Sequence, residues 1–397
     1  MEVLEISINI NKGVEYMKIR YFDHAATTPV DNEVLKEMMP FFSQNFGNPS
    51  SIYSIGKSNK QEVQIARNRV ATALNVKPQE IYFTSCGSES DNLAIKGIAY
   101  GNRKKGNHII TTRIEHPAVL KTCEFLEKQG YHITYLSPNS NGIINVKELE
   151  RYIMPNTILV SVMFANNEIG TIQDIKAIGE LCRRKNVYFH TDCVQAVGNV
   201  RIDAKEMNID SLSLSAHKFY GPKGVGAVYI REGINFVRIQ DGGHQERDKR
   251  AGTENVAGIV GLGKAIELAN NSLDEYNNHL TRLRDYYIEN VQKRIPNIKI
   301  NGDLEKRLPG NANISFIGAD GEKVLEELDK IGICASSGSA CSAGLLNPSH
   351  VLLAIGVAPN VASTSLRITF GKENTLEDVD YLVENLTNII EKIRNEK

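Results

Sequence analysis

A lysine that could react as an amine stands in SLSLSAHKFYGPKGVGAVYI, residues 211–230. The alternation of Ser and Leu over 211–215 predicts a strand, and Ser215, His217 and Lys218 come at its end, before a turn rich in Gly and Pro. A lysine at a strand end that faces a cleft can be desolvated and lose its charge, as an imine-forming amine must. Most lysines beside turns are solvated surface residues, so the pattern alone leaves both interpretations open.

A second segment, EIYFTSCGSESDNLAIKG at residues 80–97, has the pattern of a strand, a turn of small residues and a helix. The backbone N–H groups of Gly87 and Ser88 would begin that helix, where unpaired donors and the helix dipole bind phosphate. Ser88 and Asp91 also fit S/T-x-x-D/E, the sequence of a capping box. The segment therefore predicts either a phosphate site or an ordinary helix start.

Polar residues follow three further predicted strands. Asp192 ends VYFHTD, Asn167 follows TILVSVMFA, and His116 follows HIITT. A carboxylate at the end of an apolar strand is costly to bury without a cation or donor, and a protonated pyridine nitrogen would be such a partner for Asp192. Together with Ser88 these residues would meet at one edge of a sheet, although each alone also suits a cap or a turn.

One of the six cysteines, Cys341, lies among small residues in SSGSACSAG, residues 336–344. No two cysteines form a CxxC pair, which argues against structural zinc and a thioredoxin-like site, and we expect no resident metal. Free cysteines are usually small buried hydrophobic residues. Cys341 is therefore either such a residue or a nucleophile on a loop that moves easily.

The elements that would position these residues alternate regularly from about residue 57. Strands are predicted at 80–85, 108–112, 131–136, 157–165, 187–192, 211–215 and 226–230, with amphipathic helices between most of them. This alternation predicts an α/β fold with a mostly parallel sheet covered by helices on both faces. Such sheets bind ligands at the C-terminal ends of their strands.

The predicted pattern of secondary structure changes after about residue 254, where long helices lead to a smaller α+β region. We expect a large domain at 28–269, and a small domain made of 17–27 and 270–397 that carries the loop of Cys341. Residues 1–16 are predicted to be an N-terminal extension, because organised sequence begins at Met17. The sequence does not decide between Met1 and Met17 as the start.

The composition is that of an ordinary globular protein, with 397 residues, 41% hydrophobic residues and a net charge of −1. A chain without a basic field does not suit binding to nucleic acid or to an anionic membrane. No apolar run approaches the roughly 18 residues of a membrane span, and the acidic N-terminus does not suit a secretory signal. We expect a cytoplasmic protein that acts on a small or weakly charged partner.

Ten segments, in order and spacing, resemble the cysteine desulfurases of the NifS/IscS type. They are YFDHAATTP, GNPSS, SESDNLAIKG, EHPAV, NNEIG, HTDCVQAVG, SAHKFYGPKG, ERDKRAGTENV, SSGSACSAG and SLRITFG. The resemblance covers roughly residues 20–395. It implies a fold-type I α/β enzyme that uses pyridoxal 5'-phosphate to take sulfur from L-cysteine.

The resemblance implies a role for each residue that matches a family motif. Lys218 would bind pyridoxal phosphate as an imine, Asp192 would pair with the pyridine N–H, and His116 would stack on the ring and assist proton transfer. Gln195 would bond the phenolic oxygen of the cofactor. Asn167 would lie near that oxygen and the substrate carboxylate.

The remaining implied contacts involve the phosphate and the substrate carboxylate. The phosphate would be bound by Gly87, Ser88, Ser215 and His217. Thr253, in RAGT, would reach the phosphate of the neighbouring subunit of a homodimer. Arg367, in SLRITFG, would bind the substrate carboxylate through a bidentate pair.

The same resemblance implies that Cys341 attacks the substrate sulfur, so that L-alanine is released and a persulfide stays on the enzyme. Its loop of Gly, Ser and Ala would carry the sulfur to an acceptor, such as an iron-sulfur scaffold or a tRNA thiolation enzyme. Two positions depart from the family pattern. Cys86 replaces a usual glycine, and Tyr53 replaces a common histidine.

Three other hypotheses are compatible with the motifs. The chain could be a selenocysteine lyase or another fold-type I enzyme such as an aminotransferase, and an aminotransferase would not need Cys341. It could also be an inactive sulfur-delivery scaffold, although the presence of Lys218, Asp192 and Arg367 together argues against that. In a third hypothesis the persulfide of Cys341 transiently ligates iron shared with a scaffold protein.

Overall fold

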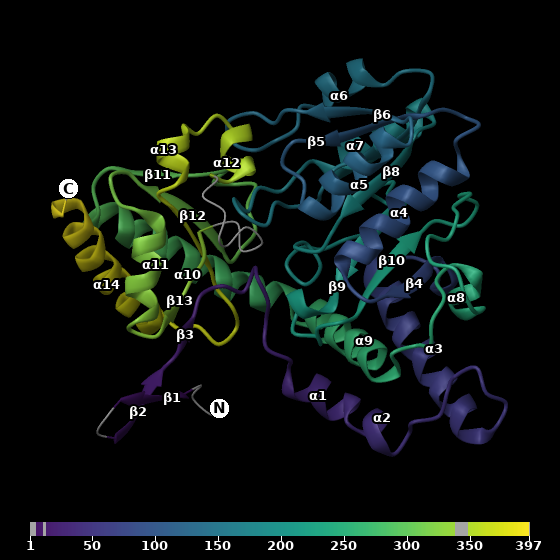
Figure 1. The fold of residues 1–397 in the computed structure, drawn as a ribbon, viewed down its shortest axis with the longest axis horizontal. Coiled ribbons are helices and arrows are strands. Elements are labelled where there is room, and N and C mark those ends of the chain that lie inside the picture. The colour runs from purple at the N-terminus through teal and green to yellow at the C-terminus, as the bar shows by residue number, and fades with distance from the viewer. Residues whose placement is uncertain (1–4, 11–12, 338–347, 397) are drawn as a thin grey trace.

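The computed structural model describes residues 5–10, 13–337 and 348–396 (Figure 1). Its largest sheet has seven strands in the order β4-β10-β9-β8-β7-β5-β6. They are β4 (Ile81–Thr84), β5 (His108–Thr112), β6 (His132–Leu136), β7 (Thr157–Ser161), β8 (Tyr188–Asp192), β9 (Ser211–Ser215) and β10 (Gly226–Ile230). Only β10 runs antiparallel to its neighbours in this sheet, which confirms the predicted mostly parallel sheet.

Helices cover both faces of this sheet, because the central strands are apolar on both sides. One face packs against α3 (Ser54–Leu74), α7 (Ile175–Lys185) and α9 (Val256–Asn271). The other face packs against α4 (Gly87–Gly101) and α5 (Pro117–Lys128). Along β10, Ala227 and Tyr229 face the first layer, whereas Val228 and Ile230 face the second. The alternation along each strand therefore builds two separate apolar layers.

The remaining elements of this part are short. They are α1 (Asn32–Met38), α2 (Pro40–Ser43), α6 (Val146–Tyr152), α8 (Gln245–Asp248) and the 3-10 turns η1 (Pro78–Glu80) and η2 (Ala216–Lys218). Because β4, β5, β7, β8 and β9 run in the same direction, their C-terminal ends meet at one edge of the sheet. That edge faces the C-terminal part of the chain (Figure 1).

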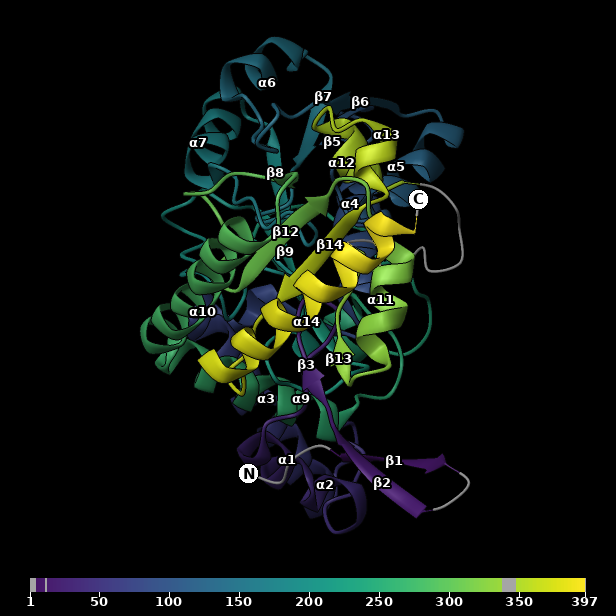
Figure 2. The same ribbon diagram turned by 90° about the vertical axis from the view of Figure 1, so that its left-hand side faces the viewer.

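The C-terminal part has its own sheet and core. Its strands β11 (Ile298–Ile300), β12 (Asn311–Phe316) and β14 (Ser365–Thr369) form an antiparallel sheet. Its helices are α10 (Leu273–Arg294), α11 (Gly321–Asp329), α12 (His350–Ala354), α13 (Pro359–Ala362) and α14 (Leu376–Asn395). Helices α11 and α14 lie along this sheet (Figure 2), and Leu328 and Leu386 are buried in the same core as Ile314.

An N-terminal strand belongs to this second core. Strand β3 (Arg20–Tyr21) pairs in parallel with β13 (Ile333–Cys334), and Phe22 is fully buried against Phe370. These contacts favour the division into 28–269 and 17–27 with 270–397, which we keep as a proposal. Residue 22 is thus far from its core partners in sequence but not in space.

The chain begins with a hairpin of β1 (Glu5–Ile10) and β2 (Gly13–Lys18) that projects from the rest of the chain in both views (Figures 1 and 2). The limit expected at residue 16 for the N-terminal extension falls inside β2. In the described part of the chain no helix is long and apolar enough to cross a membrane.

Candidate cofactor and substrate site

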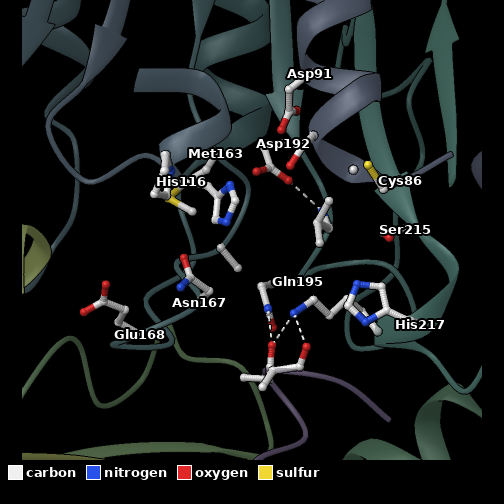
Figure 3. Close-up of a pocket in the computed structure, with 18 of the residues that line it drawn as sticks. Cys86, Asp91, His116, Met163, Asn167, Glu168, Asp192, Gln195, Ser215 and His217 are labelled. Atoms are coloured by element: carbon white, nitrogen blue, oxygen red, sulfur yellow. Dashed lines mark hydrogen bonds between the residues drawn. The ribbon is translucent and has the colours of Figure 1, made fainter. Parts of the chain in front are cut away.

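One pocket of about 320 Å³ lies at the C-terminal edge of the large sheet (Figure 3). Ten of the residues singled out from the sequence line it: Gly87, Ser88, His116, Asn167, Asp192, Gln195, Ser215, His217, Lys218 and Arg367. Thr253 is exposed and does not line this pocket. Cys341 lies outside the described residues.

Lys218 comes directly after β9, at the end of η2. Its Nζ donates hydrogen bonds to the carbonyl oxygens of Ala25 at 2.5 Å and Ala26 at 2.8 Å. The same segment is tied to the turn, since the Thr28 N–H donates to His217 O at 2.9 Å. Ala25 and Ala26, more than 190 positions away in the sequence, thus hold the Lys218 amine inside the pocket. Ala25 lies in the motif YFDHAATTP, but the sequence does not predict the contact between Ala25 and Lys218.

Asp192 is 5% exposed at the end of β8 and accepts a hydrogen bond from the Val194 N–H at 2.8 Å. Burial raises the pKa of its carboxyl, and the positive forms of His116 and Lys218 oppose that shift. A cation placed beside Asp192 would therefore favour the ionised carboxylate. A protonated pyridine nitrogen is a cation of this kind.

His116 is the N-cap residue of α5, and its Nδ1 accepts the Ala118 N–H at 3.1 Å. Burial lowers the pKa of the imidazole, so the ring is neutral. Because Nδ1 is an acceptor, the proton of the neutral ring is on Nε2. His116 can therefore donate a hydrogen bond through its Nε2–H group.

The turn after β4 leads into the start of α4, and this helix start lines the pocket. Cys86 is the N-cap residue, and its side chain makes no capping bond to the first N–H groups. A Cβ on Gly87 would lie 2.6 Å from Val194 Cγ2, so the close approach there needs glycine. Ser215 Oγ is buried beside this turn, with no hydrogen-bond partner among the described residues. These donors suit a phosphate group.

The alternative of a capping box at Ser88 and Asp91 is wrong. The helix begins at Gly87, two residues earlier than that box requires, and the Asp91 side chain lines the pocket, 1% exposed. Cys86 has an extended φ of −175°, a backbone conformation that any residue adopts. This explains why cysteine fits at this position.

Arg367 lies on β14, on the opposite side of the pocket from the large sheet. Its Nη2 lies 2.6 Å from Asp23 Oδ1, and its Nη1 donates to Asn167 O at 3.1 Å. The side chain is 2% exposed and held in one orientation by both parts of the chain. A guanidinium fixed in this way suits a carboxylate ligand.

The pocket is also lined by residues that were not proposed as site residues from the sequence, among them Asp91, Met163, Glu168 and His350. His350 Nε2 bonds Glu115 O at 3.0 Å, and the Ser349 hydroxyl donates to Glu168. Burial raises the pKa of Glu168 to about 7. Local signals for Glu168 and His350 are weak, because their partners are 181 and 235 residues away.

Residues 20–382 match the family model for aminotransferase class-V, and the chain belongs to this family. Among curated relatives, the protein named cysteine desulfurase IscS of Clostridium botulinum is 58% identical over 376 residues, which are 94% of this chain and 95% of that protein. These matches confirm the resemblance found in the motifs.

Two solved structures extend the comparison. A NifS-like protein has a TM-score of 0.89 and 38% identity, covering 94% of this chain and 100% of that one. A structure described as SspA in complex with cysteine has a TM-score of 0.80 and 37% identity, covering 90% of this chain and 100% of that one. The expected fold-type I architecture is therefore confirmed.

Enzymes of this family depend on pyridoxal phosphate. The pocket fits that group, because it combines an amine, a buried carboxyl at a strand end and uncapped donors at a helix start. In the described part of the chain, no group of three or more His, Cys, Asp or Glu side chains is arranged to hold a metal ion.

Proposed function

We propose that this chain is a cysteine desulfurase that converts L-cysteine to L-alanine and carries the sulfur as a persulfide on Cys341. One observation carries the proposal. The residues just before and just after the segment that contains Cys341 are both bonded to residues that line the pocket. Before the segment, Ser336 exchanges two backbone hydrogen bonds with Arg367, at 2.6 and 3.3 Å. After it, Ser349 bonds Glu168, and His350 lines the pocket.

Bound pyridoxal phosphate supplies an electron sink that stabilises negative charge at the substrate Cα. We assign its aldehyde to Lys218 and its pyridine nitrogen to Asp192. Gln195 and Asn167 would bind the phenolic oxygen. The phosphate is assigned to Gly87, Ser88, Ser215 and His217. Each of these groups lies on the pocket wall, at the ends of strands or at the start of α4.

The substrate is assigned to the side of the pocket formed by β14. Arg367 binds the carboxylate of L-cysteine, with Asn167 beside it. This places the substrate amine toward Lys218, whose freed amine takes the proton from Cα. His116 is assigned to assist these proton transfers, with its Nε2–H group as the donor. A structure at 37% identity, described as SspA in complex with cysteine, supports a substrate of this size and charge.

Sulfur leaves the substrate by attack of the Cys341 thiolate on the substrate sulfur atom. The S–S bond forms, the C–S bond breaks with its electron pair on carbon, and a proton adds to Cβ. L-cysteine and one enzyme thiol thus become L-alanine and one enzyme persulfide. The persulfide passes its outer sulfur to an acceptor protein, such as an iron-sulfur scaffold or a tRNA thiolation enzyme.

A homodimer and a cytoplasmic location are part of this proposal. Thr253 is exposed, as a residue that reaches a neighbouring subunit must be. Exposed apolar side chains within residues 39–53, here called the α2 surface, offer an interface: Met39, Phe42, Phe46, Ile52 and Tyr53. The five described cysteines are free thiols, which fits a reducing compartment.

Mass spectrometry of the intact holoenzyme and its peptides after L-cysteine tests the proposal. We expect one added sulfur atom on the peptide with Cys341, and L-alanine in equal amount before an acceptor is added. Cys341→Ser should abolish both. Cys334→Ser is the matched control, because Cys334 is half-buried on β13 outside the pocket, and it should retain both.

Two outcomes would point elsewhere. Unchanged alanine release by Cys341→Ser would contradict the sulfur-transfer step and favour another reaction of the family. If Cys341→Ser released alanine from L-selenocysteine but not from L-cysteine, the chain would be identified as a selenocysteine lyase.

A further inference from the structure

A second carboxyl group lies behind Asp192, at the same end of the pocket (Figure 3). Asp91 is in the second turn of α4, four residues after Gly87, and its side chain is 1% exposed. Its Oδ1 is buried with no hydrogen-bond partner among the described residues. A buried polar atom without a partner in a residue that lines a pocket needs an explanation.

The nearest imidazole does not provide a cation for Asp91. His190 Nε2 lies 3.7 Å from Asp91 Oδ1 and is fully buried. The ring bonds Ser161 Oγ at 2.9 Å through Nδ1 and Ser213 Oγ at 3.1 Å through Nε2. Burial lowers the pKa of His190 to about 3, so the ring is neutral. His190 therefore packs and hydrogen-bonds but does not balance a negative charge.

The other ionisable groups that act on Asp91 are acidic. They are Asp192 on β8, Glu115 after β5 and Cys86 before α4, and Ser213 on β9 adds a hydroxyl. Burial and the Asp192 charge both raise the pKa of Asp91 well above its usual value. A buried carboxyl on which the Asp192 charge acts in this way does not ionise together with Asp192 in a low dielectric.

The two carboxyls differ in what surrounds them. Asp192 accepts the Val194 N–H and lies near Lys218, whose positive form favours its ionised state, whereas the nearby His116 ring is neutral. For Asp91, the Ser213 hydroxyl is the group that favours ionisation. The proton of the pair therefore belongs on Asp91 once a cation lies beside Asp192.

We propose that Asp91 is a positioning residue that stays protonated in the holoenzyme, supports Asp192 through a hydrogen bond from its carboxylic O–H, and leaves Asp192 as the single negative charge for the pyridine nitrogen. This inference rests on the proposed role of Asp192. It adds a residue that acts through Asp192 and does not touch the substrate.

Two substitutions separate the hydrogen bond from the charge. Asp91→Asn keeps a donor of the same size without a charge, so we expect the dissociation constant for pyridoxal phosphate to stay within about twofold. Asp91→Leu keeps the volume but removes the donor, and we expect at least about tenfold weaker binding, because hydrogen bonds to charged groups contribute about 1.5–3 kcal/mol. Binding is measured by adding the cofactor to the apoprotein, with circular dichroism as the control for folding.

An infrared spectrum of the holoenzyme gives a readout that a purely structural role would not produce. A protonated carboxyl has a C=O band separate from that of a carboxylate, and Asp91→Asn should remove one such band. Glu115→Gln assigns the separate band of Glu115, whose pKa burial raises to about 8. The infrared test stands even if Asp91→Leu does not fold.

The outcomes distinguish this inference from the proposed function. The inference would be overturned if Asp91→Asn kept every band of a protonated carboxyl, or if it bound the cofactor tenfold more weakly. Normal cofactor binding by folded Asp91→Leu would overturn it as well. Normal cofactor binding by Asp192→Asn would instead overturn the role assigned to Asp192. If Asp192→Asn bound the cofactor weakly while folded Asp91→Leu bound it normally, the proposed function would stand. Only the role inferred for Asp91 would be lost.

Discussion

Single residues in this pocket act through the fixed orientation of their polar atoms. The Nζ of Lys218 is directed by two carbonyl oxygens, and the Nδ1 of His116 is closed by a backbone N–H. Arg367 is held between Asp23 and the Asn167 carbonyl. Such preorganised groups bind a charged substrate without an ordering cost at the time of binding.

The substitution Arg367→Lys should raise the KM for L-cysteine. Lysine has one ammonium group and cannot keep contacts with Asp23 and Asn167 while it binds both oxygens of a carboxylate. We expect an increase of about tenfold or more, the effect of losing one hydrogen bond between charged groups. Steady-state kinetics of alanine formation measure it.

Arg201→Lys provides the matched control, because Arg201 is an exposed partner of Asp274 outside the pocket. Its KM should not change. An unchanged KM in Arg367→Lys would show that another group binds the substrate carboxylate.

Elements, rather than single residues, connect the two sides of the pocket. The turn after β7 carries Asn167 and Glu168, and it meets β14 through Arg367 and the start of α12 through Ser349. Asn311 and Asn313 on β12 donate to Glu168 O at 3.3 and 3.2 Å. This turn is therefore the point where the large sheet is joined to the segment that carries Cys341.

Glu168 predicts a pH dependence of stability. Burial raises its pKa from 4.5 to about 7, so the folded chain binds a proton that the unfolded chain loses. Its contribution to the free energy of unfolding is therefore largest below pH 4.5 and decreases as the pH rises to about 7. The total change from this one group is about 3 kcal/mol at most.

The substitution Glu168→Gln tests this contribution, because glutamine can still accept from Ser349 but does not ionise. Thermal unfolding at pH 5 and pH 8 should show a smaller loss of stability in Glu168→Gln than in the unmodified chain. Glu206→Gln is the control, because Glu206 is an exposed partner of Lys176. Equal pH dependence in all three proteins would contradict a protonated Glu168.

At the scale of the whole molecule, the site combines two cores that are separate in space. The large sheet contributes strand ends, and β14 and the segment after β3 contribute Arg367 and the carbonyls of Ala25 and Ala26. A relative movement of the two parts would change the distance between Lys218 and Arg367. The proposed cofactor and substrate sites are therefore expected to be coupled through this junction.

The α2 surface predicts that two chains associate. Phe46 and Ile52 are 74% and 86% exposed, and both belong to a group of neighbouring apolar residues in the sequence. Replacing both by Glu should shift the protein from dimer to monomer in light scattering, because charges at the centre of an apolar interface stay unpaired. Cofactor affinity should fall as well, since Thr253 would no longer reach a neighbouring subunit.

Leu304→Glu is the control, because Leu304 is 59% exposed and lies outside the α2 surface. This variant should stay dimeric. A monomeric unmodified chain at micromolar concentration would contradict the dimer directly.

Much of the site follows from the sequence, because polar residues at the ends of apolar strands are visible in local patterns. The strand ending in Asp192, the strand before Lys218 and the turn at Gly87 have these patterns, and parallel strands necessarily bring such ends to one edge. The tertiary structure alone decided that Asp91 faces inward beside Asp192 instead of capping its helix. It also decided that Ala25 and Ala26 hold Lys218, since those contacts join residues more than 190 positions apart. Periodicity reports which face of an element is buried, but it does not report what lies opposite that face.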